Sequence, residues 1–269
     1  MIIVLDIGGT HIRVARSDDG VTLTKTVIGD TPVSFMLGVE FIKNTIASLA
    51  GTEPVTMIVG ALAGVVDQTS GNLFSAQNLP EWKGNSLSKE LASIAPTYIE
   101  NDAALAGLAE AVLGAGKSFP IVAFVTASTG IGGARIVNQK IDAHAYGFEP
   151  GKQIIDRSGM GSVESLASGR AIEKLHGAPP QLITDKKVLD DAARDIAIAL
   201  YNISVLWAPH IIVLGGPEVV NKPGIDVDAI RSYMKNFPVV FPTMPEVKLG
   251  DLGSEAGLKG ALLLAKQKR

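Results

Sequence analysis

The chain has 269 residues, of which 46% are hydrophobic, a formal net charge of −3 and no cysteine. Without cysteine, disulfides and thiolate metal sites are excluded. The slightly acidic balance, with no dense basic run before the final KQKR, argues against nucleic-acid and membrane-surface partners. No apolar run reaches the roughly 18 residues of a membrane span, and Met1 leads straight into an expected strand without a basic leader. We therefore expect a soluble cytoplasmic protein.

The first half of the chain alternates strands and helices. Two apolar runs around a Gly-Gly turn predict a hairpin of residues 2–6 and 11–16. Thr31 before Pro32 predicts a helix start, and Gly51 predicts its end. The other elements expected here are strands at 21–28, 55–60 and 97–100, a turn at 67–71, a loop at 72–84, and helices at 86–94 and 103–114.

The second half repeats the layout of the opening. Residues 121–140 consist of an apolar strand, a glycine-rich turn, an alternating strand and a polar turn, as residues 2–20 do. This pattern indicates an internal duplication, with one half near 1–100 and the other near 118–250. Helices are also predicted at 162–176, 186–207 and 254–266, and a buried strand near 210–215 that meets a glycine pair. Strands alternating with helices predict an α/β fold.

Four glycine-rich or acidic motifs stand at the ends of apolar strands, where α/β proteins collect ligands. Each motif alone is compatible with an ordinary tight turn. Their order and spacing together are much more specific. The motifs are Asp6-Ile7-Gly8-Gly9-Thr10, Glu100-Asn101-Asp102-Ala103, Ser128-Thr129-Gly130-Ile131-Gly132-Gly133 and Leu214-Gly215-Gly216-Pro217.

With these motifs the sequence resembles the ROK family of sugar kinases, in the actin-like ATPase superfamily, over nearly its whole length. ALAGVVDQTSGNLFSAQNLPEWKG is similar to that family's loop into the sugar site, and VESLASGRAI to the end of its second signature. The resemblance implies an α/β fold with two ribonuclease-H-like lobes, and nucleotide and sugar in the cleft between them. We expect a small lobe at 1–115, to which a C-terminal helix at 254–269 returns, and a large lobe at 116–253.

The expected cofactors are ATP and Mg²⁺. Two glycine turns, one from each half, would clamp the triphosphate through N–H and hydroxyl donors. A glycine pair would let adenine or ribose lie close to the backbone, and Asp6 would hold Mg²⁺ through water, because Mg²⁺ dehydrates reluctantly. The residues expected to bind the cofactors are Asp6, Gly8, Gly9, Thr10, His11, Thr129, Gly130, Gly215 and Gly216.

Asp102 is the expected catalytic base, because a sugar hydroxyl is a poor acid and its attack on phosphate profits from a positioned base. The alternative is that Asn101 or Asp102 only caps the helix that follows, and both roles are compatible. For Asn78 the alternative is an Asx turn, and for Glu164 a favourable place in the first turn of a helix. By resemblance, the substrate-binding residues are Gly64, Asn78, Asn101, Asp102, Glu149, Lys152 and Glu164.

Two departures from the family concern the segment expected to recognise the substrate. The family commonly has Glu-x-Gly-His where this chain has Glu149-Pro150-Gly151-Lys152. The family's cysteine-rich zinc motif is here IDRSGMGSVE, with Ser162 where a cysteine would fall. We therefore expect no zinc site, and packing of Ile154, Ile155 and Val163 in its place. For Lys152 two roles stay open: a donor to the sugar, or a surface pair with Glu149.

The implied function is ATP-dependent phosphorylation of a hexose or hexosamine, with glucose at its 6-position as the leading substrate and fructose and N-acetylmannosamine next. A homodimer that binds a small-molecule sugar is expected. A non-catalytic sugar sensor is one alternative, although the family's repressors carry a helix-turn-helix for which the five residues before Asp6 leave no room. An actin-like assembly ATPase is another, and the sugar-loop resemblance argues against it. Polyphosphate stays open as the phosphoryl donor.

Overall fold

The computed structural model describes residues 1–68 and 70–269, and these form two compact units. The first unit comprises Met1–Ala109, Ala143–Gly147 and Ser254–Arg269, and the second Glu110–Asp142 and Phe148–Gly253. The turn predicted at 67–71 includes Thr69, which lies outside the described residues. No helix in the described part of the chain is long and apolar enough to cross a membrane.

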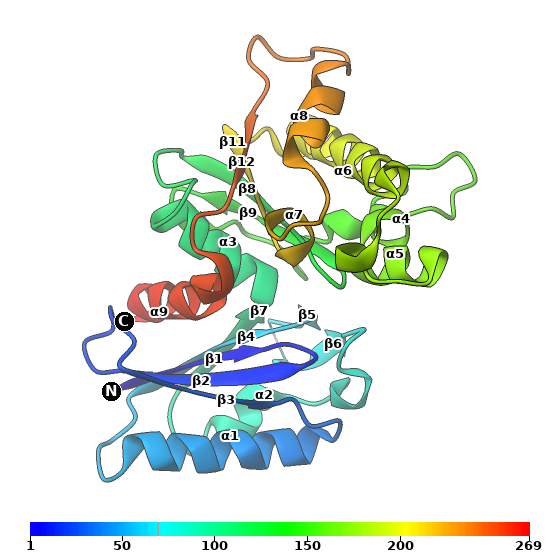
Figure 1. Ribbon diagram of the computed structural model, residues 1–269. Coiled ribbons are helices and arrows are strands. Elements are labelled where there is room, and N and C mark those ends of the chain that lie inside the picture. The colour runs from blue at the N-terminus through cyan, green and yellow to red at the C-terminus, as the bar shows by residue number, and fades with distance from the viewer. Residues whose placement is uncertain (69) are drawn as a thin grey trace. The chain divides into compact units, whose positions relative to one another are not determined.

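Both units alternate strands and helices, as Figure 1 shows. Elements of the first unit are β1 (Ile2–Ile7), β2 (His11–Ser17), β3 (Lys25–Asp30), α1 (Phe35–Ala50), β4 (Met57–Leu62), β5 (Val65–Val66), β6 (Leu73–Ser75), α2 (Leu87–Leu91), β7 (Thr97–Asn101) and α9 (Ala256–Lys268), with a 3-10 turn at Pro80–Trp82. The chain passes into the second unit within α3 (Asp102–Val112). The second unit holds β8 (Ile121–Ala127), β9 (Ile131–Val137), β10 (Lys140–Ile141), α4 (Val163–Ala167), α5 (Gly169–His176), α6 (Lys186–Trp207), β11 (Ile211–Gly215), α7 (Pro217–Val220), α8 (Val227–Lys235) and β12 (Glu246–Leu249), with 3-10 turns at Pro150–Lys152 and Pro180–Leu182.

The two units are built on sheets of the same topology. The first sheet has the strand order β3-β2-β1-β4-β7, and the second β10-β9-β8-β11-β12. In each, the central strand pairs antiparallel with the strand that follows it and parallel with a later one. This shared order confirms the repeated layout inferred from the sequence.

Strand β1 is buried on both faces of the sheet. Because successive side chains point to opposite faces, alternate residues of β1 pack against different helices. Ile3, Leu5 and Ile7 pack in one core with α1 and α2. The opposite face, which carries Asp6, meets α9, and Figure 1 shows α1 and α9 on opposite sides of this sheet. A Cβ placed on Gly257 would lie 3.1 Å from the Asp6 carboxyl carbon, so the start of α9 lies directly against Asp6.

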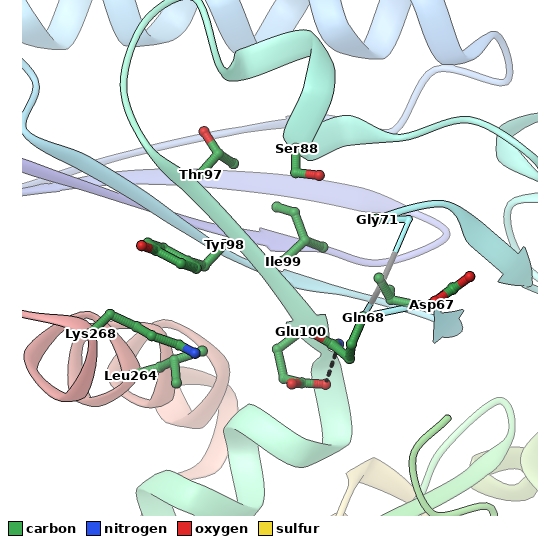
Figure 2. Close-up of a pocket in the computed structure, with 11 residues that line it drawn as sticks. Asp67, Gln68, Gly71, Ser88, Thr97, Tyr98, Ile99, Glu100, Leu264 and Lys268 are labelled. Atoms are coloured by element: carbon green, nitrogen blue, oxygen red, sulfur yellow. Dashed lines mark hydrogen bonds between the residues drawn. The ribbon is translucent and has the colours of Figure 1, made fainter. Parts of the chain in front are cut away.

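The end of α9 packs beside β7. Lys268 Nζ lies 5.3 Å from the centre of the Tyr98 ring, as Figure 2 shows from close by. Such cation–π contacts contribute roughly 0.5–1 kcal/mol at exposed sites. The C-terminal helix therefore belongs to the sheet that begins the chain.

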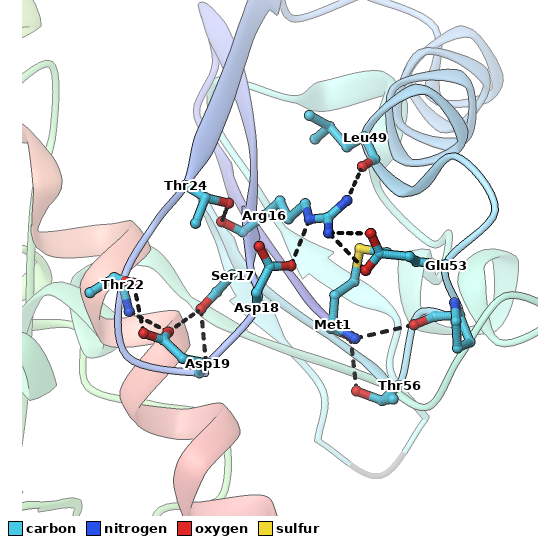
Figure 3. A network of polar contacts seen from close by, with 12 residues as sticks. Met1, Arg16, Ser17, Asp18, Asp19, Thr22, Thr24, Leu49, Glu53 and Thr56 are labelled. Carbon is cyan, nitrogen blue, oxygen red and sulfur yellow. Dashed lines mark hydrogen bonds and ion pairs between the residues drawn. The ribbon is translucent and has the colours of Figure 1, made fainter.

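Two polar clusters lie at the end of β2 and in the turn that follows it (Figure 3). Arg16, in β2, donates to both carboxylate oxygens of Glu53 at 2.8 Å and to Leu49 O at 2.8 Å, which joins the strand to the end of α1. The Asp19 carboxylate accepts from the backbone N–H groups of Val21 and Thr22 at 2.8 Å each, and these bonds hold the pKa of Asp19 well below its usual range. Because this turn occupies residues 19–22, β3 begins at Lys25 rather than at residue 21 as predicted.

Other predicted boundaries also shift for local reasons. Helix α1 begins at Phe35 with Ser34 as its N-cap, not at Pro32, because Thr31 bonds back to the first turn through Thr10 O and Gly8 O. The single helix predicted at 162–176 is two helices, α4 and α5. Ser168 breaks it, since its backbone is extended and its hydroxyl accepts from Ala171 N at 3.2 Å.

Helices α4, α5, α6, α7 and α8 each contribute buried side chains to the second core. The helix predicted at 186–207 is confirmed as α6, whose buried face carries small and branched apolar residues such as Ala193, Ala197 and Leu200. The sequence patterns did not predict α8 or β12. Their residues Val227, Ile230 and Val247 are buried in this core, so only the packing of α6 and β11 gives these short segments their partners.

Candidate active site

Two carboxylates stand at one edge of the first sheet. Asp6 lies near the end of β1 and Asp102 directly after β7, and β4 pairs parallel with both strands. The pKa of Asp102 is raised to about 6, mainly by burial; the negative charge of Asp6 adds to the rise, and the N–H of Ala103, 2.8 Å from Asp102 Oδ1, opposes it. The pKa of Asp6 is also raised by burial, against the opposing charge of Arg13.

Arg13 is a site residue that sequence reasoning missed. Its Nη1 lies 3.2 Å from Asp6 Oδ2 and donates to Ser254 O at 2.7 Å, which ties the hairpin to the segment before α9. The hairpin register places Asp6 directly opposite Arg13. The predicted hairpin could have identified Arg13 as the partner of Asp6, because opposite charges across an antiparallel strand pair attract.

Asn101 joins two segments that are far apart in the sequence. Its Oδ1 accepts from Ala104 N at 3.0 Å, and its Nδ2 donates to Gly64 O at 2.9 Å. The first bond confirms a capping role for Asn101, and it leaves Asp102 as the first residue of α3. The structure thus brings Gly64 next to Asn101, the residue before Asp102.

The first glycine turn lies against Asn78. A Cβ on Gly9 would overlap the Asn78 side chain, whereas a Cβ on Gly8 would meet only His11 O, at 3.7 Å. Gly8 N donates to His11 O at 3.0 Å, so this N–H is engaged within the turn itself. His11 is exposed, with Nδ1 3.3 Å from Asp30 Oδ1. Gly9 is therefore required by close approach to the predicted sugar loop.

A pocket of about 140 Å³ opens on the first unit, lined partly by Gln68, Tyr98, Glu100 and Lys268 (Figure 2). None of the predicted site residues lines it. It adjoins them through Glu100, whose Oε1 accepts from Asn101 N at 2.8 Å and from Gln68 Nε2 at 3.3 Å. Burial raises the pKa of Glu100. Glu100 therefore supports the backbone from which Asn101 and Asp102 project.

In the second unit, the turn around Thr129 and Gly130 meets the start of α5. Ser128 N donates to Gly130 O at 2.8 Å within the turn. Gly169 N donates to Ser128 O at 2.8 Å, and Arg170 N to Thr129 O at 3.3 Å. Backbone bonds thus fix the conformation of this turn from both sides.

Glu164 is held close to the same turn. Its Oε2 accepts from Ile131 N at 3.0 Å, and its Oε1 forms an ion pair with Lys152. Lys152 N also donates to Glu149 O at 3.0 Å, while Glu149 itself is exposed. The structure therefore gives Lys152 an ion-pair partner, Glu164, that the sequence did not suggest.

The second glycine pair ends β11. Gly216 has φ +95°, and a Cβ there would overlap Ala127 O, so the turn into α7 requires glycine. Glu218 follows in α7 with 6% exposure, and its Oε2 accepts from Gln181 Nε2 at 3.0 Å. Burial raises the pKa of Glu218, a carboxylate that the sequence analysis did not single out.

The loop from Gln153 to Val163 closes on itself. Asp156 Oδ2 accepts from Ser158 Oγ at 2.7 Å, Asp156 Oδ1 from Met160 N at 3.2 Å, and Ile155 N donates to Gly161 O at 3.0 Å. Val163 is buried and Ile155 packs on the core, but Ile154 is 52% exposed. The expectation that Ile154 packs in this loop is therefore wrong, because an isolated bridge to Ser162 holds it at the surface. Among the described residues, no three His, Asp or Glu side chains are grouped to hold a metal ion.

Comparisons with known proteins agree over the full length of the chain. A model of the ROK family matches residues 2–268. The chain is 26% identical to a glucokinase of Streptomyces coelicolor, over 99% of this chain and 98% of that protein. It is 25% identical to an N-acetylmannosamine kinase of Haemophilus influenzae, over 96% and 93%. A ROK family glucokinase from Streptomyces griseus, solved in complex with glucose and AMPPNP, matches with a TM-score of 0.80 at 25% identity and covers 99% of each chain.

Proposed function

Since the chain belongs to the ROK family and has the actin-like ATPase fold, we propose that it is a sugar kinase that transfers the γ-phosphate of ATP to a hexose or hexosamine, with glucose at its 6-hydroxyl as the first substrate. The observation that carries the proposal is Asp102 at the head of α3, with its pKa raised to about 6. A base with a pKa close to the working pH is the most effective, and this carboxylate is still ionised at neutral pH.

In the proposed reaction, Asp102 takes the proton of the sugar hydroxyl. The hydroxyl oxygen then forms a bond to the γ-phosphorus, the bond from that phosphorus to the bridging oxygen breaks, and ADP leaves. Asn101 caps α3 and bonds to Gly64 O, so it fixes the backbone that carries Asp102. Such positioning supplies much of the catalysis in phosphoryl transfer.

The sugar would be held by side chains with many acceptor oxygens. Glu149 and Glu164 would accept hydrogen bonds from sugar hydroxyls, as the family resemblance implies, and Asn78 and Asn101 would both donate and accept. Lys152 stands where the family commonly has histidine. Because the relatives include a glucokinase and an N-acetylmannosamine kinase, fructose and N-acetylmannosamine are the next candidates after glucose.

The residues present fit a magnesium nucleotide. Mg²⁺ is usually bound by one or two carboxylates besides phosphates and water, and Asp6 offers a partly buried carboxylate at the strand end. Mg²⁺ held there would neutralise charge on the phosphates. The turn at Gly8–Thr10, the turn at Thr129–Gly130 and the Gly215–Gly216 pair would hold the nucleotide.

A coupled ADP-release assay over glucose, fructose, mannose, N-acetylglucosamine and N-acetylmannosamine tests the proposal. We expect glucose to give the highest kcat/KM with Mg²⁺ and ATP, and Asp102→Asn to abolish the signal with every sugar. Polyphosphate as donor is tested by the appearance of glucose 6-phosphate without ATP. Binding of a sugar without turnover of any sugar would contradict the proposal and favour a non-catalytic sugar sensor. Light scattering and cell fractionation test the predicted homodimer and cytoplasmic location.

A further inference from the structure

One carboxylate, that of Glu164, connects three segments of the second unit. Glu164 belongs to the first turn of α4, where Ser162 and Ser165 form a capping box. Its Oε2 accepts from Ile131 N, directly after the glycine turn, and its Oε1 pairs with Lys152 in the 3-10 turn. Only 15% of the Glu164 side chain is exposed. The carboxylate is therefore fixed in place.

The position of Glu164 conflicts with the proposed task of the turn beside it. A Cβ on Gly130 would lie 2.9 Å from Glu164 Oε2, so this oxygen is in contact with the turn. An ATP phosphate bound at Thr129 and Gly130 would thus approach a second negative charge. Like charges a few ångströms apart repel, and they do so more strongly where burial limits the screening by water.

The ammonium of Lys152 pairs with the other oxygen of Glu164 and offsets its charge. We propose that Lys152 is a positioning residue that neutralises Glu164 beside the Thr129–Gly130 turn and so permits that turn to hold a nucleotide phosphate. This inference rests on the proposed function, because it takes from it the phosphate-binding role of the turn. It deepens that function by giving Lys152 an effect on nucleotide affinity that requires no sugar.

The alternative roles of Lys152 make different predictions. A lysine that only donates to the sugar affects sugar affinity and leaves nucleotide binding in the absence of sugar unchanged. A lysine that only holds the loop affects both affinities, and removing the charge of Glu164 as well does not restore them. If Lys152 acts by neutralising Glu164, nucleotide affinity should depend on the net charge of the Lys152–Glu164 pair: the more negative the pair, the weaker the binding.

The test is the binding of AMPPNP with Mg²⁺, measured by calorimetry without sugar at low ionic strength. Lys152→Met leaves a net negative pair and is expected to weaken binding roughly three- to tenfold. Glu164→Gln leaves a net positive pair, keeps an acceptor for Ile131 N, and is expected to bind at least as tightly as wild type. The double variant Lys152→Met/Glu164→Gln is neutral, like wild type, and is expected to return to within about twofold of it.

Controls separate the pair from general effects. Lys187→Met removes an exposed ion pair with Asp191 in α6 and is expected to leave the affinity unchanged. Lys152→Arg keeps the charge and should keep the affinity, and the loss in Lys152→Met should shrink at high salt. Thermal melting of each variant shows that it is folded.

The possible results distinguish failure of the proposed role of Lys152 from failure of the proposed kinase function. An unchanged affinity in Lys152→Met, or a double variant as weak as Lys152→Met, overturns the role of Lys152 while the kinase proposal stands. Wild-type protein that binds no AMPPNP overturns the nucleotide assignment itself, and the inference falls with it.

Discussion

The negative charge of Asp6 raises the pKa of Asp102, and the two side chains stand at the ends of β1 and β7 in one sheet. Asp6→Asn removes that charge, so the pKa of Asp102 should fall below its wild-type value of about 6. Carboxyl carbon NMR titration of the free protein, without Mg²⁺ or nucleotide, measures this directly. An unchanged Asp102 midpoint in a folded variant would show that the two carboxylates are not coupled.

Asp102→Asn should lower kcat by at least roughly a hundredfold, because the base is lost, while AMPPNP still binds. The same change should stabilise the protein at neutral pH. Folding raises the pKa of Asp102 from 3.8 to about 6. The protonated carboxyl therefore costs no stability below pH 3.8, and the folded protein loses stability as the pH rises through about 6 and the buried carboxyl must ionise.

Thermal melting across pH checks this second effect. The Asn variant should exceed wild type by about 1–3 kcal/mol above pH 6, and the difference should vanish as the pH falls toward 4. Turnover within a few-fold of wild type would refute the base assignment, and a stability difference that is independent of pH would refute the burial argument.

Gly8 and Gly9 make a matched pair for testing the first glycine turn. From sequence alone, Gly9→Val is expected to weaken ATP binding far more than sugar binding. The contact of Gly9 with Asn78 changes that expectation, since a side chain at Gly9 displaces the sugar loop too. Gly8→Ala fits the free protein, so it should weaken nucleotide binding by obstructing close approach and spare sugar binding. Equal losses of both affinities in Gly8→Ala, measured by calorimetry, would count against a phosphate-binding turn.

Asn101→Ala should cost about 1 kcal/mol of stability, because the Ala104 N–H loses its cap, and it should also lower kcat, because Gly64 O loses its donor. Asp226→Ala is the matched control: Asp226 caps α8 through Asp228 N at 3.1 Å and has no proposed role in the reaction. Its stability loss should be similar with kcat unchanged. If both variants keep wild-type kcat, Asn101 is a cap and nothing more.

The loop at 153–163 should be held by Asp156 and need no zinc. Asp156→Ala removes the acceptor for Ser158 Oγ and Met160 N, so trypsin should cleave faster after Arg157. The bond from Ser158 and the backbone N–H of Gly161 lower the pKa of Asp156, so the loop should also open as the pH falls through that lowered value. Added zinc should not slow trypsin cleavage of either the wild-type protein or the Asp156→Ala variant. Near-stoichiometric zinc in elemental analysis of the purified chain, or activity lost to a zinc-selective chelator in excess Mg²⁺, would contradict this reading.

Much of the framework follows from the sequence because it depends on neighbouring residues. Apolar runs, glycine turns and cap residues specify local geometry, so the first hairpin, α6 and the glycine pair after β11 are found from pattern alone. The repeated layout extends this to the shared order of the two sheets. The predictions fail where a side chain bonds out of its local pattern, as Thr31 does at the start of α1.

The properties that matter for chemistry arise only in the tertiary structure. Asp102 is an ordinary acidic residue in the sequence, and its raised pKa comes from burial and from the carboxylate of Asp6, which is distant in the sequence. The hydrogen bond from Asn101 to Gly64 spans 37 positions of the sequence. Glu164, which forms an ion pair with Lys152, was not among the partners that the sequence suggested for that lysine. Loss of water and the approach of distant charges set these properties, and both depend on which segments the fold brings together.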